Sequence, residues 1–199
     1  MLLTEDTSVA DSVLPLEVCK DHMRLGSGFS TDAMQDALIL SFLRAAFAAI
    51  EARTGKALLM RQFRWTLYKW SDPVAQVLPI APVTEIADLR MKTRFGVTTP
   101  IAPTAYWLEQ SAHRPRLRAA TAALPTIPTD GSVDVVFEAG YGPSWDRVPD
   151  DLQQAVLMLA AHFYEFRSDT GLEAQRLPFG VSSLIETYRS VRMGTGVAQ

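Results

Sequence analysis

Apolar residues recur at helical spacing through the stretch from 148 to 167, VPDDLQQAVLMLAAHFYEFR. Pro149 suits the first turn of a helix, and Asp150 and Asp151 complement the positive end of the helix dipole. The residues at three- and four-residue steps are Leu152, Ala155, Val156, Leu159, Phe163 and Phe166. Because apolar residues also fill most of the remaining circumference, the pattern predicts a helix over about 149–167 that is covered on several sides.

Three other segments show a helical period. The segment 14–25 indicates a short helix that Gly26 ends, and 31–54 indicates a long helix that Gly55 ends. The segment 181–192 has an apolar side and carries arginines in its last turn, where they complement the negative end of the dipole. The sequence therefore predicts four helices, two on each side of a long central segment.

That central segment, 57–140, changes to an apolar period of two, with aromatic and β-branched residues in place of alanine. In 61–70, RQFRWTLYKW, one face carries Phe63, Trp65 and Leu67, and the other carries polar side chains and Tyr68. No helix-length crossover separates the candidate strands, as parallel pairing would require. We therefore expect an antiparallel sheet.

The helices must pack together to bury their apolar stripes, and the sheet extends from one end of that bundle. The predicted fold class is α+β, a mainly α-helical bundle with an inserted small antiparallel β-sheet region. We expect one domain over 14–192, a flexible N-terminal arm over 1–13 and a C-terminal tail over 193–199.

Charge and cysteine content restrict the function. The net charge of -3 and the isoelectric point near 5.6 disfavour tight binding to duplex DNA as the main activity. Cys19 is the one cysteine of the chain, so no intramolecular disulfide is expected, which suits a reducing compartment. The acidic N-terminus lacks the pattern of a signal peptide, and we expect synthesis in the bacterial cytoplasm and no membrane partner.

Candidate chemistry is sparse. His22, His113 and His162 fall in different predicted elements, and none has a second His or Cys at metal-ligand spacing. Gly26-Ser27-Gly28 lacks the preceding strand and the following Lys-Ser/Thr pair of a phosphate-binding loop. We therefore predict no catalytic, cofactor-binding or metal-binding residues, and no enzyme.

Two alternatives remain open. A soluble enzyme or ligand-binding module would place a cryptic site between the sheet and the bundle, marked by convergent buried titratable groups. A sequence-independent DNA-binding protein would use the basic side chains of the β region, among which Trp65, Tyr68 and Trp70 are interleaved.

Six segments, taken in order along the chain, match the segments of a known family. They are LPLEVCKDHMRL, AAIEARTGKAL, LPIAPVTEI, VVFEAGYG, VPDDLQQAVLMLAAHFYEFR and LPFGVSSLIETYRSVR. With these segments the sequence resembles the head-tail connector, or adaptor, proteins of tailed phages and of related prophages and gene transfer agents. The match extends from about Leu14 to Arg192, but residues 95–129 follow none of the family's patterns.

The resemblance implies a structural role in the neck of a phage-like particle. Members form a homo-oligomeric ring, typically a dodecamer, beneath the portal protein. The ring presents a surface to the next neck (stopper) or tail protein, and the packaged DNA passes through its channel with only passive contact. No cofactor is implied.

Two groups of contact residues are predicted within that frame. The last helix and tail, with mixed apolar and basic character, predict portal contacts at Tyr188, Arg189 and Arg192. The aromatic residues of the first long strand predict subunit contacts at Phe63, Trp65 and Tyr68, because a small sheet with aromatic residues seldom stands alone in water.

Overall fold

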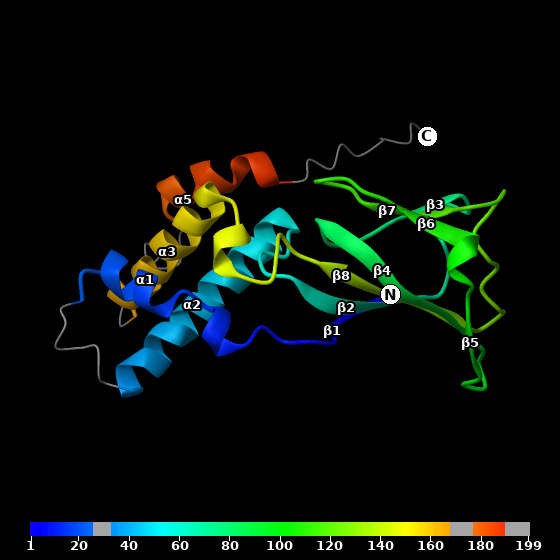
Figure 1. Ribbon diagram of the computed structural model, residues 1–199, viewed down its shortest axis with the longest axis horizontal. Helices are drawn as coiled ribbons and strands as arrows, with labels where there is room; N and C mark the ends of the chain where they lie inside the picture. The colour runs from blue at the N-terminus through cyan, green and yellow to red at the C-terminus, as the bar shows by residue number, and fades with distance from the viewer. Residues whose placement is uncertain (26–32, 168–176, 190–199) are drawn as a thin grey trace, which may run out of the picture.

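The helices and the strands of this chain occupy opposite ends of an elongated molecule (Figure 1). The computed structural model describes residues 1–25, 33–167 and 177–189. The expectation of a mainly helical bundle with one small sheet is wrong. The described residues form four α-helices and eight strands in two antiparallel sheets, with 36% helix and 26% strand.

The helical end is organised around α3, which packs against the other three helices. Leu152, Ala155, Val156 and Leu159 of α3 are fully or almost fully buried, as the helical period predicts. Gly55, with φ +67°, ends α2 in the left-handed conformation that glycine adopts without strain. The helices are α1 (Leu16–His22), α2 (Ala33–Thr54), α3 (Asp150–Glu165) and α5 (Phe179–Ile185), the last followed by a 3-10 turn, η5 (Glu186–Tyr188).

These helices lie within the ranges expected from the sequence, except that α5 begins two residues earlier and ends in a 3-10 turn. Residues 190–192 of the expected last helix and the tail 193–199 lie outside the described residues.

The strand end is a sandwich of two sheets. The larger sheet has the strand order β1-β2-β8-β4-β5, and the smaller has the order β3-β7-β6. Every pair of neighbouring strands is antiparallel, as predicted. The strands are β1 (Leu2–Glu5), β2 (Arg61–Leu67), β3 (Ala75–Val77), β4 (Val83–Lys92), β5 (Thr98–Pro100), β6 (Tyr106–Glu109), β7 (Arg116–Ala119) and β8 (Ser132–Ala139).

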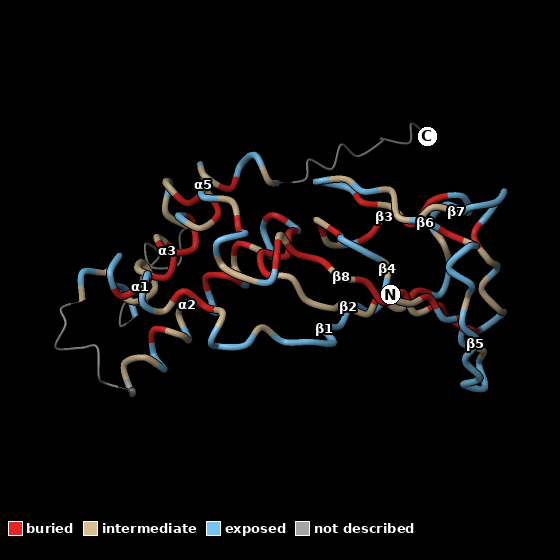
Figure 2. Tube along the Cα trace, viewed as in Figure 1, coloured by how far each residue is buried: buried red, intermediate tan, exposed pale blue. Residues whose placement is uncertain are grey.

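The two sheets enclose a second hydrophobic core, separate from the core of the helical end (Figure 2). Phe63 and Phe137 stack at its centre, with their ring centroids 5.8 Å apart. The smaller sheet supplies Leu117 and Tyr106 from the other side. This core explains why the sheet region is larger than the sequence suggested: the apolar face of β2 is covered by strands of three or four residues.

The N-terminal segment is part of the larger sheet and is not a free arm in the structure. Leu2–Glu5 forms β1, which pairs with β2 from Leu2 opposite Thr66 to Glu5 opposite Phe63. Without β1, β2 would be an edge strand with unpaired backbone N–H and C=O groups. Those groups bond the backbone of β1, although the sequence of β1 has no apolar period.

Candidate assembly interfaces

An ion-pair cluster fixes the joint between the helical end and the strand end. The Glu51 carboxylate on α2 accepts hydrogen bonds from Arg61 Nη2 at 2.7 Å and from the Leu58 backbone N–H at 2.8 Å. Arg61 Nε also lies 2.8 Å from Glu5 Oε1 on β1. Burial lowers the pKa of Arg61, but the hydrogen bond and charge of Glu51, together with Glu5, raise it overall. The cluster therefore ties α2, β1 and β2 together.

Gly140 lies at the same joint, where β8 leads out of the sheet toward α3. Its φ is +139°, and a Cβ added there would lie 2.4 Å from both Cα and N of Met60. The backbones stay this close because the Tyr141 N–H donates to the Leu58 carbonyl at 3.3 Å, and the Met60 N–H donates to the Gly142 carbonyl at 2.8 Å. The segment between α2 and β2 and the segment between β8 and α3 thus cross in direct backbone contact.

The three predicted portal residues have different environments. The Tyr188 hydroxyl donates to Asp151 Oδ1 at 2.7 Å, and the Tyr188 ring meets Tyr141 edge-on at 6.5 Å between centroids. Burial, with the nearby Asp151 charge, raises the pKa of Tyr141 to about 12. Through its hydrogen bond to Asp151, Tyr188 anchors the chain to the start of α3. Arg189 is exposed and pairs with Glu186 at 3.0 Å, and Arg192 lies outside the described residues.

Beside Arg189 lies a hollow of about 250 Å³ between the end of α2 and α5. Leu177 and Ile185 form its apolar lining, and Arg53 stands with Arg189 at its edge. An apolar hollow with two guanidinium groups suits a segment that carries both an apolar and an acidic side chain.

The three predicted subunit-contact residues also differ in burial. Phe63 and Trp65 are each only 4% exposed, because they face the smaller sheet that the sequence did not predict. Both belong to the sandwich core, which leaves Phe63 out of reach of a neighbour, whereas Trp65 also lines an open hollow beside Tyr68. Tyr68, just beyond the end of β2, is 65% exposed and is available to a neighbour.

Sequence reasoning missed three exposed apolar side chains at the strand end. Phe95, Val97 and Trp107 are 78%, 61% and 50% exposed. Phe95 and Val97 flank Gly96 in a hairpin turn, where polar residues are usual. Apolar residues at such positions could have indicated an exposed apolar surface. All three lie in the segment 95–129, to which no family pattern assigned a role.

The described residues contain no cluster of three or more metal-ligating side chains, and none of their helices is long and apolar enough to cross a bilayer. The His162 ring packs on Phe166 with centroids 4.6 Å apart. Lys56 is the one fully buried lysine among them: its Nζ bonds the Ala112 carbonyl, and burial lowers its pKa. These contacts are structural, and none of them favours the enzyme alternative.

Solved structures of similar proteins agree with the arrangement described above. A chain in the neck of an empty gene transfer agent (GTA) particle, computed with C6 symmetry, is 47% identical, with a TM-score of 0.90. The match covers 98% of this chain and 99% of that chain. This protein belongs to the head-tail connector family.

Two further matches support the assignment of this protein to the connector family. A chain in the virion of a native GTA particle is 47% identical with a TM-score of 0.88, and one in the neck of a native GTA particle computed with C12 symmetry is 45% identical with a TM-score of 0.85. Each match covers 98% of the connector and 99% of the other chain, so residues 95–129 are included. No family model and no curated protein matches the sequence.

Proposed function

We propose that this connector forms a closed homo-oligomeric ring, of twelve subunits in the complete neck, beneath the portal of a tailed phage-like particle. The carrying observation is the near full-length similarity to neck chains of GTA particles, two of which come from necks computed with C6 and C12 symmetry. The ring joins the capsid to the next neck (stopper) or tail protein as a structural part of the particle.

A ring of identical subunits needs a heterologous contact, in which one surface of a subunit meets a different surface of the next. The elongated molecule, with its helical and strand ends, offers distinct surfaces for such a contact (Figure 1). The net charge of -3 suits a channel through which DNA passes without adhering.

The portal contact is assigned to the chain that leaves η5. Arg189 is exposed there, beside the hollow that it shares with Arg53, and Arg192 follows in the sequence. Tyr188 acts in this proposal as an anchor that holds the departing chain on α3 through Asp151. The side chains that reach the portal are then Arg189 and Arg192.

Truncation after Tyr188, which removes both Arg189 and Arg192, is expected to abolish portal binding while leaving the helical core folded. An earlier stop, after Gly180, would remove Val181 and Ile185, which are 0% and 2% exposed in that core, and would confuse unfolding with lost binding. Native mass spectrometry of the connector with its portal measures the complex, and circular dichroism checks the fold.

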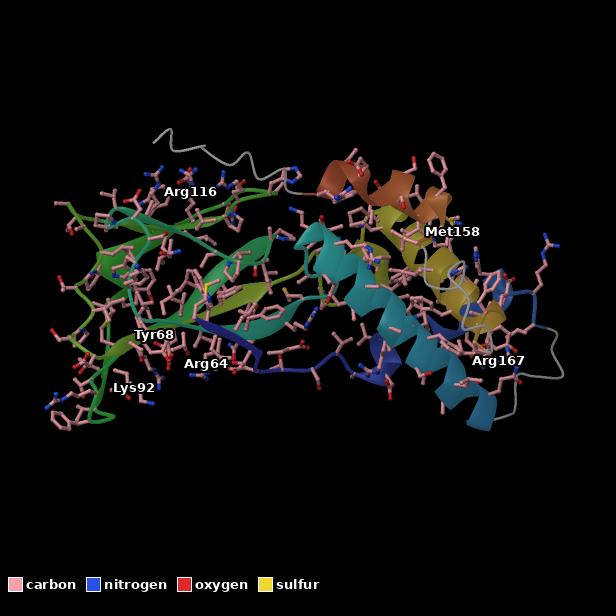
Figure 3. The ribbon with its side chains drawn as sticks, turned by 180° about the vertical axis from the view of Figure 1, so that it is seen from behind. Arg64, Tyr68, Lys92, Arg116, Met158 and Arg167 are labelled. Atoms are coloured by element: carbon pink, nitrogen blue, oxygen red, sulfur yellow. The ribbon has the colours of Figure 1, made fainter. Side chains whose placement is uncertain are left out.

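A single substitution refines the same test. Arg189→Ala should weaken portal binding by about tenfold, the typical loss on removing an interfacial charge that pairs with a partner. Arg167→Ala, at the opposite end of the helical region (Figure 3), is the matched control and should bind normally. Unchanged binding of the truncated chain would exclude this portal contact.

A further inference from the structure

The hairpin between β4 and β5 presents an apolar tip in a fixed shape. The Thr93 N–H donates to the Val97 carbonyl and the Gly96 N–H donates to the Thr93 carbonyl, both at 2.9 Å. Gly96 has φ +83°, which favours glycine in this turn. Phe95 and Val97 therefore project from a closed turn, and little conformational freedom remains to be lost on binding.

At the other edge of the same sheet, the sandwich is open. A hollow of about 410 Å³ lies between the two sheets there. Met1 and Tyr68 form its exposed walls, and Trp65 and Leu67 of the sandwich core line it. We call this hollow the sandwich mouth; its full lining is Met1, Trp65, Leu67, Tyr68, Lys69, Ser71 and Gln76. A second hollow, of about 340 Å³, also has Tyr68 in its lining.

The hairpin tip and the sandwich mouth belong to opposite edges of one sheet, because β5 and β1 are its two edge strands. Phe95 is 78% exposed, so the tip does not fill the mouth of its own subunit. Both features lie toward the strand end, where Figure 3 labels Tyr68 and Lys92. An apolar projection and an apolar hollow on opposite edges form a heterologous pair, as successive subunits of a ring require.

We propose that the hairpin tip of one connector binds the sandwich mouth of the next connector, with Phe95 as the inserted side chain and Tyr68 as the receiving wall. This contact rests on the ring proposed above and identifies one of its subunit interfaces. It is a side-chain contact and not an extension of the sheet, because β5 is three residues long and ends at Pro100, which has no backbone N–H.

Charge does not drive this approach. Residues 90–100 carry three basic and no acidic side chains, and the one charged side chain in the lining of the mouth is Lys69. Lys92 and Arg94 form no ion pair within the described part of the chain. The acidic side chains of residues 1–13 pair with Arg61, Arg64 and Arg44 of the same subunit, so the proposed contact rests on the fit of apolar surfaces.

Disulfide trapping in assembled particles tests the contact. Connectors with both Tyr68→Cys and Phe95→Cys should form, under oxidation, a ladder of covalent multimers on a non-reducing gel, because each subunit links to the next. Cys19 does not interfere: it is fully buried, and burial raises the pKa of its thiol to about 11. The control pairs Tyr68→Cys with Asp21→Cys on α1, and it should give no ladder.

The outcomes separate this contact from the ring itself. A ladder only in the double variant supports the proposal. Particles that contain the double variant but give no ladder overturn the contact while the ring stands, and absence of the unsubstituted connector from particles overturns both. Two other outcomes would also overturn the proposed contact, because the hairpin tip would then bind a different partner. They are a disulfide between the Phe95→Cys variant and another neck protein, and salt-dependent retention of DNA by the hairpin.

A second variant does not depend on oxidation. Phe95→Ser should reduce incorporation of the connector into particles by about tenfold, as expected when a buried aromatic contact is lost at an interface. Its matched control is Phe179→Ser, which removes an 87% exposed phenylalanine from the helical end and should leave incorporation unchanged. Equal incorporation of the two variants would contradict the proposal, and unchanged melting temperatures show that both remain folded.

Discussion

Gly140→Ala is expected to destabilise the connector by about 4 kcal/mol or more, a large part of the ~5–15 kcal/mol that stabilises a typical domain. The new Cβ would lie 2.4 Å from Cα and N of Met60 and 2.6 Å from the carbonyl carbon of Leu59. These are backbone atoms, so the side chain cannot avoid them by rotating. The two backbone segments must separate at the joint and lose the hydrogen bond between Tyr141 and Leu58. Urea unfolding measures the loss.

Gly55→Ala is the matched control for that substitution. Gly55 also has a positive φ, +67°, but no atom lies within 4 Å of the added Cβ. The control therefore carries only the left-handed backbone strain, about 1–2 kcal/mol. If the two variants unfold at the same urea concentration, close backbone contact at Gly140 does not hold the joint.

Arg61→Ala is expected to cost about 3 kcal/mol, the lower end of the range for removing one partner of a buried ion pair. The Arg61 side chain is 11% exposed and that of Glu51 is 16% exposed. Without the guanidinium, Glu51 keeps only the Leu58 N–H as a partner, and Glu5 loses its ion pair. The measurement is again the free energy of unfolding in urea.

Arg64→Ala supplies the comparison for this prediction. Arg64 lies on the same strand and pairs with Asp6 at 2.6 Å, but its side chain is 42% exposed. Exposed pairs contribute about 1 kcal/mol or less, so Arg64→Ala should change stability little. Equal losses for the two arginine variants would show that the joint does not depend on the buried cluster.

Local patterns were sufficient for the elements that carry their own period. The stripe of α3 and the alternation of β2 predicted a helix and a strand because burial on one face leaves its period in the sequence. The Gly140-Tyr141-Gly142 segment contributed to the family resemblance, and its close backbone contact gives a physical reason for the first glycine.

Long-range pairing could not be predicted in the same way. Residues 105–109 and 116–119 were short candidate strands, close to β6 and β7, but segments of three or four residues do not show which strands pair, and β3 pairs with β7 across about forty residues of chain. Without that sheet, the apolar face of β2 had no cover, and Phe63 and Trp65 were assigned to a neighbouring subunit. Likewise, the bond from Tyr188 to Asp151 joins residues far apart in sequence, so Tyr188 looked available to the portal.

The most direct measurement of the central claim is electron microscopy of particles from cells that lack only the coding sequence of this connector. The account predicts DNA-filled or empty capsids separated from free tails, and joined particles again when the intact chain is supplied in trans. Joined particles with a complete neck, formed at the normal frequency without the connector, would contradict it.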